Sequence, residues 1–168
     1  MFTIYSADVK GNPSNCSYPH KHIIINGDTL KSAVSHDYVC AEYKNSYRNG
    51  DNFIGSDCLP VDCDNDHSDN PDDWISPDDV RKAFPGARFA VHYSRSNNKV
   101  KNGKAARPKF HILFPIDYVT DAKAYADTFI AYNKTKKIEE TKAHVTLEDM
   151  FNQIEAGKLK ELNLIIKA

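Results

Sequence analysis

Two aspartates, Asp62 and Asp64, lie two residues apart in the run Leu59-Pro60-Val61-Asp62-Cys63-Asp64-Asn65-Asp66. Successive side chains of a β-strand point to opposite faces, so the alternation predicts that both carboxylates share one face. Like charges held this close raise each other's pKa unless a positive charge lies between them. Carboxylate oxygens suit Mg²⁺ or Mn²⁺, and Mg²⁺ typically takes one or two carboxylates with waters and phosphates. The pair indicates a divalent-cation site, with a solvated acidic turn as the alternative.

Charge is segregated along the chain. The formal net charge is −1 over 168 residues, so no overall field attracts nucleic acid or a membrane. Residues 57–79, however, carry nine Asp and no Lys or Arg, whereas residues 95–109 carry six Lys or Arg and no acid. The first segment can hold cations, and the second can hold phosphates.

His111 lies in an apolar strand pattern directly after the basic segment. Alternation places His111 and Leu113 on one face and the residues Phe110, Ile112 and Phe114 on the other. A single His in such a strand is usually a core residue. We expect this strand to form a hairpin with Phe89–Tyr93, which is followed by Ser94-Arg95-Ser96, and this neighbourhood favours contact with phosphate.

Composition limits the remaining classes of site and location. Cys58 and Cys63 with His67, or Cys16 with His20 and His22, would be candidate zinc ligands, but their spacing lacks the paired C-x₂-C pattern. No run approaches the roughly 20 apolar residues of a membrane span, and the start of the chain lacks the pattern of a signal peptide. We therefore expect a cytoplasmic protein with reduced cysteines and no membrane partner.

The elements expected around these residues predict an α+β fold, with a mixed, mostly antiparallel sheet and flanking helices. Helices are expected at 28–36, 77–84 and 121–132, the first capped by Asp28 or Thr29 and the second by Ser76. Acids in the first turns of helices, such as Asp78, Asp79 and Asp121, are better explained as capping residues than as metal ligands. The expected strands begin at Phe2 and cover 22–25, 38–43, 53–55 leading into the Asp strand, 89–93 and 107–115.

Residues 2–132 together resemble the archaeo-eukaryotic primase superfamily of primase-polymerases. Val61-Asp62-Cys63-Asp64 is similar to the metal motif of that family, and Lys109-Phe110-His111 is similar to its nucleotide motif. The runs 58–73, 93–95 and 103–115 look like primase domains carried by plasmids and conjugative elements of Gram-positive bacteria.

The resemblance implies roles for individual residues. Asp62, Asp64 and His111 would be catalytic, and the two aspartates would hold Mg²⁺ or Mn²⁺ for in-line phosphoryl transfer. A second group would bind the nucleotide phosphates: Ser94, Arg95, Lys104, Arg107 and Lys109.

The chain departs from this family pattern after residue 133. The third carboxylate, which the family carries on a later strand, has no evident counterpart, although Asp117 or Asp121 could substitute. Residues 145–168 instead resemble part of bacterial translation initiation factor two. We therefore expect a truncated primase-polymerase-like domain at 1–133 and an unrelated tail at 134–168, made of a charged linker, a helix and a strand.

Three functions are compatible with these patterns. The first is binding of DNA or RNA and nucleotides by a mobile-element protein with an incomplete two-metal site, which would act by inhibiting a partner such as a host defence nuclease, as anti-CRISPR proteins do. The acidic segment 57–79 could then imitate a phosphate backbone. The second is metal-dependent nucleotide transfer by a primase or polymerase. The third is a folded fragment without activity.

Overall fold

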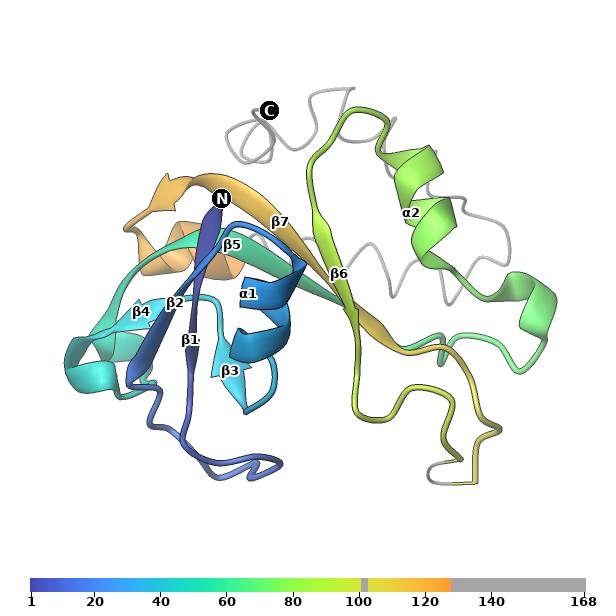
Figure 1. The fold of residues 1–168 in the computed structure, drawn as a ribbon, viewed down its shortest axis with the longest axis horizontal. Helices are drawn as coiled ribbons and strands as arrows, with labels where there is room; N and C mark the ends of the chain where they lie inside the picture. Colours follow the sequence, from blue (N-terminus) through green and yellow to red (C-terminus); the bar gives the residue numbers. More distant parts are fainter. Residues whose placement is uncertain (101–102, 128–168) are drawn as a thin grey trace. The chain divides into compact units, whose positions relative to one another are not determined.

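The computed structural model describes residues 1–100 and 103–127. These residues form an α+β fold with antiparallel sheets and short helices, as expected (Figure 1). They fall into two compact units, one made of 1–59 with 115–127 and the other of the described residues within 60–114. The expected boundary at 133/134 and the tail 134–168 lie outside the described residues, so that division stays a prediction. No helix in the described part is both long and apolar enough to cross a membrane.

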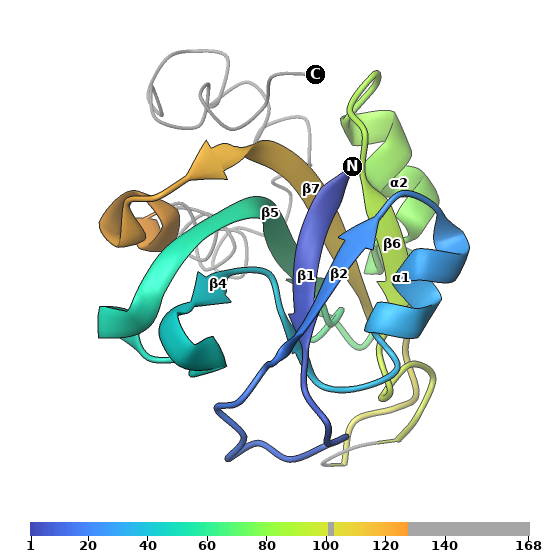
Figure 2. The ribbon, with the colours of Figure 1, turned by 60° about the vertical axis from the view of Figure 1, so that its left-hand side comes forward.

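The first unit contains a three-stranded antiparallel sheet in the order β2-β1-β3. Its strands are β1 (Phe2–Ser6), β2 (His20–Ile24) and β3 (Tyr38–Val39). Alternate residues of β1 are buried, which is the pattern that its sequence predicts. Helix α1 (Gly27–Ala33) lies beside β1 and β2 (Figures 1 and 2).

Helix α1 differs from its prediction at both ends. Asn26, not Asp28 or Thr29, is the N-cap, because the Asn26 side chain accepts from the backbone N–H of Thr29 while the Thr29 side chain accepts in return from the N-cap backbone. The helix ends at Ala33, three residues earlier than expected.

The expected strand 38–43 is wrong as a single element. It is divided into β3 and β4 (Glu42–Tyr43), which belong to different sheets, and the buried Cys40 and Ala41 connect them. Strand β3 pairs with β1 through Val39 and Tyr5, whereas β4 pairs with β5 through Glu42 and Gly55. The chain thus passes from one sheet to the next in the middle of an apolar run, and a change of pairing partner leaves no signal in the hydrophobic pattern.

The second sheet has the order β4-β5-β7-β6, and its two longest strands run through both units. Strand β5 (Phe53–Cys63) runs from Phe53 into the Asp strand, as expected, whereas β7 (Phe110–Val119) begins and ends later than predicted. Strand β7 continues past Pro115 because its pairing with β6 (Ala90–Tyr93) has already ended at Leu113, so the missing N–H of proline breaks no bond of that ladder.

In the second unit, one face of β5 and β7 forms a core with α2 (Pro77–Ala83). Its buried members are Val61, Cys63, Val80, Phe110 and Ile112. Helix α2 begins at Ser76 as predicted, with Ser76 and Asp79 forming a reciprocal capping box. Because these positions alternate along the strands, Asp62 and His111 lie on the opposite face.

The third predicted helix is only partly described. Residues 122–127 are helical, and the carboxylate of Asp121 accepts from the backbone N–H of Ala124 at 2.7 Å. The assignment of Asp121 to capping is therefore confirmed, while 128–132 lie outside the described residues.

We predict that Gly55→Ala lowers the free energy of unfolding by about 1 kcal/mol. A Cβ at Gly55 would lie 2.4 to 2.7 Å from ring atoms of Tyr118, so that ring would have to move. The measurement is urea denaturation. Gly27→Ala, where nothing lies within 4 Å, is the matched control. Since the loss comes from contact with Tyr118, Gly55→Ala should lower the free energy of unfolding by less in a Tyr118→Ala background. An equal loss in both backgrounds would contradict the packing explanation.

Candidate nucleotide and cation site

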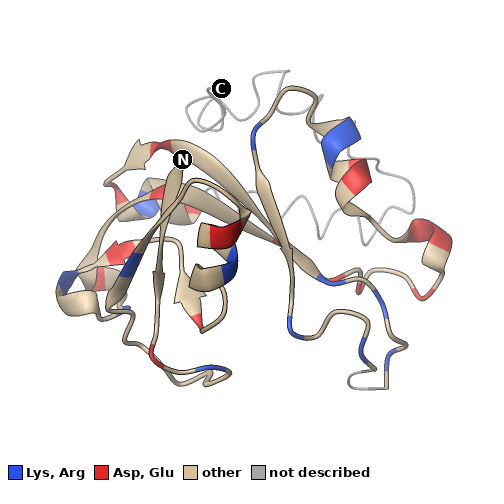
Figure 3. Cartoon of the chain, viewed as in Figure 1, with Lys and Arg blue, Asp and Glu red and all other residues tan. Residues whose placement is uncertain are grey.

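One open pocket of about 480 Å³ brings together all eight residues expected to act in catalysis or phosphate binding. Its lining consists of Asp62, Asp64, Asp66, Ser94, Arg95, Ser96, Lys99, Lys104, Ala105, Arg107, Lys109 and His111. All of them lie within the second unit. Figure 3 shows the two charge classes on neighbouring segments, with the acids after β5 and the basic residues along the loop between β6 and β7.

The basic loop is an extension of the β6–β7 hairpin. Strand β6 pairs antiparallel with β7, as expected, with His92 opposite His111 and Tyr93 opposite Phe110. Beyond the paired strands, the backbone N–H of Ser94 donates to the carbonyl of Lys109, and that of Asn98 donates to the carbonyl of Arg107, both at 2.9 Å. These bonds place the residues that follow β6 beside the residues that precede β7.

Asp62 and His111 form a pair on neighbouring strands. The Nδ1 atom of His111 lies 2.9 Å from Oδ1 of Asp62. An ionised carboxylate can only accept, so the proton of this hydrogen bond belongs to Nδ1 of the imidazole. The ring of His92 stacks on that of His111, with centroids 4.8 Å apart and planes 23° apart. Burial lowers the pKa of His92, and proximity to His111 lowers it further.

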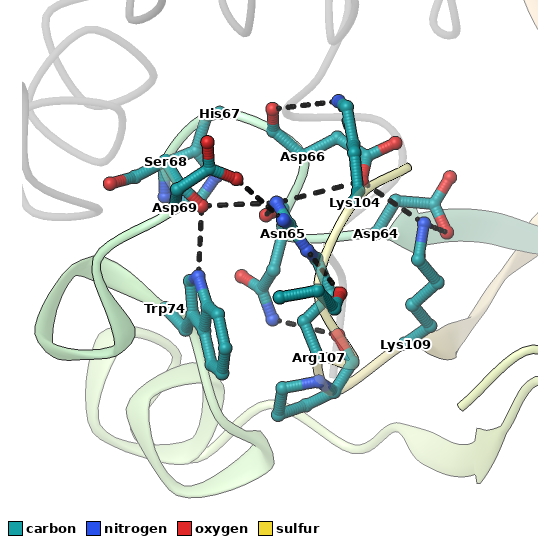
Figure 4. Close-up of polar contacts among 12 residues, drawn as sticks. Asp64, Asn65, Asp66, His67, Ser68, Asp69, Trp74, Lys104, Arg107 and Lys109 are labelled. Atoms are coloured by element: carbon teal, nitrogen blue, oxygen red, sulfur yellow. Dashed lines mark hydrogen bonds and ion pairs between the residues drawn. The ribbon is translucent and has the colours of Figure 1, made fainter. Parts of the chain in front are cut away.

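Lys109 links the two other carboxylates of the pocket. Its Nζ atom lies 3.1 Å from Oδ1 of Asp66 and 3.5 Å from Oδ1 of Asp64 (Figure 4). Lys104 adds a longer contact to Asp66 at 3.7 Å. Partial burial raises the pKa of Asp66, but the hydrogen bond from Lys109 and the charges of Lys109, Lys104 and Arg107 outweigh that effect, so its pKa is lowered overall.

Arg107 lies beneath the acidic loop, which is the part of the chain that follows β5 and includes residues 65–69. It is 1% exposed, and its guanidinium donates to the carbonyls of Asn65, Ser68 and Ala105 and to the carboxylate of Asp69, the last at 2.6 Å (Figure 4). The same group lies 5.6 Å from the ring centre of Trp74. Arg107 lines the pocket, and its hydrogen bonds also hold the loop that follows β5.

Asn65 fixes the start of that loop. Its backbone φ of 52° lies in the left-handed region, which Asn tolerates better than most residues. The buried side chain accepts from the backbone N–H of Ile75 and donates to the carbonyls of Ile75 and Pro108, at 2.8 to 3.0 Å. Asn65 thereby ties the end of β5 to the segments before α2 and before β7.

Asp62 and Asp64 are the two residues that were expected to hold a divalent cation. Asp62 and Asp64 supply oxygen atoms at the pocket, and one oxygen of each is engaged by His111 or Lys109. Within 1–100 and 103–127, no three His, Cys, Asp or Glu side chains are grouped so that they could hold a metal ion. The expectation of Mg²⁺ or Mn²⁺ at Asp62 and Asp64 therefore stays a prediction.

Several residues of the site were not singled out from the sequence. Asp66 continues the i, i+2 spacing of Asp62 and Asp64, so that spacing could have indicated it. Ser96 and Lys99 lie in the basic loop, where composition alone could not tell which side chains face the pocket. The roles of Asn65 and Trp74 had no signal in the sequence, because they depend on contacts with residues about 40 positions away or on the path of the loop.

Comparisons with known proteins match part of the chain only. Translation initiation factor IF-2 of Lachnospira eligens is 44% identical over 57 residues, which is 34% of this chain and 6% of that protein. The IF-2 of Lachnoclostridium phytofermentans is 48% identical over 48 residues, 29% of this chain and 4% of that protein. The IF-2 of Acetivibrio thermocellus is 49% identical over 53 residues, which is 30% of this chain and 5% of that protein.

The predicted resemblance to initiation factor two is thus confirmed for about a third of the chain, and this chain spans a small fraction of those relatives' length. Each aligned stretch is longer than 145–168, so the similarity extends beyond the segment for which it was predicted. No family model and no solved structure matches the chain.

We predict that Arg107→Lys lowers the free energy of unfolding by about 2–4 kcal/mol, because an ammonium cannot replace the guanidinium fork and leaves buried carbonyls and Asp69 without donors. Urea denaturation measures the loss, and the fluorescence of Trp74, the single tryptophan, reports on the loop itself. Arg81→Lys is the control, since the Arg81–Asp78 pair is exposed and should cost less than about 0.5 kcal/mol. Equal losses of unfolding free energy in the two variants would refute the role of Arg107 in holding the loop that follows β5.

Asp66 should make stability depend on pH. The pKa of Asp66 is lower in the folded protein than the ordinary value of 3.8. The contribution of Asp66 to the free energy of unfolding is therefore complete above pH 3.8, and it is lost as the pH falls through the folded pKa. The difference in unfolding free energy between wild type and Asp66→Asn should therefore be largest near neutral pH and shrink below about pH 4. Asp72→Asn, outside the pocket, is the control. A difference that stays constant down to about pH 3 would contradict this explanation.

Proposed function

We propose that residues 60–114 bind a complex of a divalent cation with a nucleoside triphosphate, and that the protein is a primase-polymerase-like domain that also contacts DNA or RNA. The observation that carries this proposal is a pocket lined by residues of both predicted motifs and of the basic loop. Its volume of about 480 Å³ lies in the range of small-molecule sites.

The balance of charge in the pocket supports a ligand that carries both signs. Three carboxylates, those of Asp62, Asp64 and Asp66, line it together with several Lys and Arg side chains. The carboxylates would repel a free polyphosphate, and the basic side chains would repel a free cation. A cation bound to a triphosphate presents each charge to its complement.

In this proposal Asp62 and Asp64 hold the cation, which would neutralise and orient the phosphates. Arg95, Lys99 and Lys104 attract the phosphates, and the hydroxyl groups of Ser94 and Ser96 can donate hydrogen bonds to them. His111 lines the pocket beside Asp62, where its imidazole can contact the phosphates. Arg107 acts indirectly by holding the acidic loop.

Binding without efficient nucleotide transfer is the form of this function that we favour. A cation held by two carboxylates depends on the substrate for the rest of its shell, which promotes joint binding of cation and nucleotide but gives less control over an attacking hydroxyl group. Template-directed transfer by a primase or polymerase is the alternative.

Inhibition of a defence nuclease by an acidic surface has weaker support. Several acids of segment 57–79 have basic partners within the protein: Asp66 with Lys109, Asp69 with Arg107, Asp78 with Arg81, and Asp79 with Lys82. A segment whose charges are balanced internally makes a poor imitation of a phosphate backbone.

The test is calorimetric titration of ATP and GTP into the full chain, with and without Mg²⁺ or Mn²⁺. We expect metal-dependent binding that weakens by about tenfold or more in Asp62→Ala with Asp64→Ala, because contacts to charged groups contribute about 1.5–3 kcal/mol each. Asp72→Ala with Asp78→Ala removes two acids outside the pocket and should leave affinity unchanged.

Incorporation of labelled nucleotide on a primed template separates the two forms of the proposal. Metal-dependent binding without incorporation supports binding as the function, and incorporation that Asp62→Ala abolishes supports nucleotide transfer. Absence of metal-dependent binding to either nucleotide would refute both.

A further inference from the structure

His92 lies in a row of three side chains that crosses three neighbouring strands. It belongs to β6, His111 to β7 and Asp62 to β5, and the sheet order places β7 between the other two. His92 is the direct cross-strand partner of His111 in the β6–β7 pairing. The residues that line the pocket include Asp62 and His111 but, in the described part of the chain, not His92.

The two neighbours of His111 restrain different motions of its ring. The contact of 2.9 Å with Asp62 fixes the position of Nδ1 at one edge. The stacked ring of His92, with centroids 4.8 Å apart, restricts rotation of the imidazole plane. The χ2 torsion of a histidine side chain has a broad range of allowed values. A hydrogen bond at one ring atom therefore does not by itself fix the tilt of the ring.

The His92 ring is itself held in place. Its Nδ1 atom lies 3.2 Å from the carbonyl oxygen of Tyr93, at the end of β6. Because an aromatic ring restrained on one side provides a fixed surface, the His111 ring can adopt its orientation before any ligand arrives. Ordering a side chain in advance removes part of the entropy cost of binding.

We propose that His92 is a positioning residue: it sets the orientation of the His111 ring, and thereby strengthens the contact of His111 with the phosphates of a cation–nucleotide complex. This inference rests on the proposed function for its ligand. The aromatic ring of His92 does the positioning, so another flat ring at residue 92 should serve nearly as well, whereas loss of the ring should act on binding through His111 alone.

The binding experiment is a double-mutant cycle on the full chain, with MgATP as the titrant. We expect His92→Ala to weaken binding about fivefold and His92→Phe to stay within about twofold of wild type, in the range of coupling between contacting residues. In a His111→Ala background, His92→Ala should have no further effect. Equal losses in both backgrounds, or equal losses in His92→Ala and His92→Phe, would overturn the proposal.

A second measurement does not need the ligand. The ring nitrogen shifts of His111, assigned by their absence in His111→Ala, should show one tautomer with the proton on Nδ1 in the wild type and in His92→Phe. In His92→Ala they should move toward an average of two tautomers. Unchanged shifts in His92→Ala would overturn the positioning role even if MgATP binds. The expected shifts with no MgATP binding would uphold the positioning of the ring and refute the cation–nucleotide function instead.

Discussion

The buried guanidinium of Arg107 is the constraint on which the candidate site depends. Removing an arginine from water costs several kcal/mol unless hydrogen bonds compensate for the lost hydration. Here the compensation comes from carbonyls of the loop that follows β5 and from Asp69. Within the described residues, no buried side-chain nitrogen or oxygen lacks a partner. The hydrogen bonds of Arg107 fix the path of the loop, so Asp66, the pocket acid that lies within it, owes its position to a residue of the basic segment.

The charged residues that are segregated along the sequence therefore have two different roles in the fold. Part of it is structural, because Arg107 and Lys109 are buried and paired with Asp69 and Asp66. Another part faces the pocket, where Arg95 and Lys99 are exposed. A count of charges along the chain cannot separate these two groups, since burial is set by the hairpin geometry that brings 107–109 back to the start of the acidic loop.

The sequence predicted which candidate residues lie close together better than it predicted the bounds of the elements around them. Alternation along two strands was enough to place Asp62 and His111 opposite the core, because one face of each strand is apolar. The basic loop was found from composition and the hairpin from its two flanking strands. The division of 38–43 between two sheets and the continuation of β7 past Pro115 could not be predicted, because both depend on which strand is the neighbour at each position. The cap of α1 differs for a local reason, because Asn26 and Thr29 form a capping box although their residue types depart from its usual Ser/Thr-x-x-Glu/Gln pattern.

Lys109 sets the conditions under which the pocket can take a cation. Its ammonium group already lies between Asp64 and Asp66, so a divalent ion at Asp64 would bring a second positive charge close to it. Two positive charges at that distance repel unless a negative group joins them. Phosphate oxygens supply that group, because they can bind the metal ion and accept hydrogen bonds from the ammonium at the same time. The arrangement of Lys109 thus disfavours a cation alone and favours a cation that arrives with a phosphate.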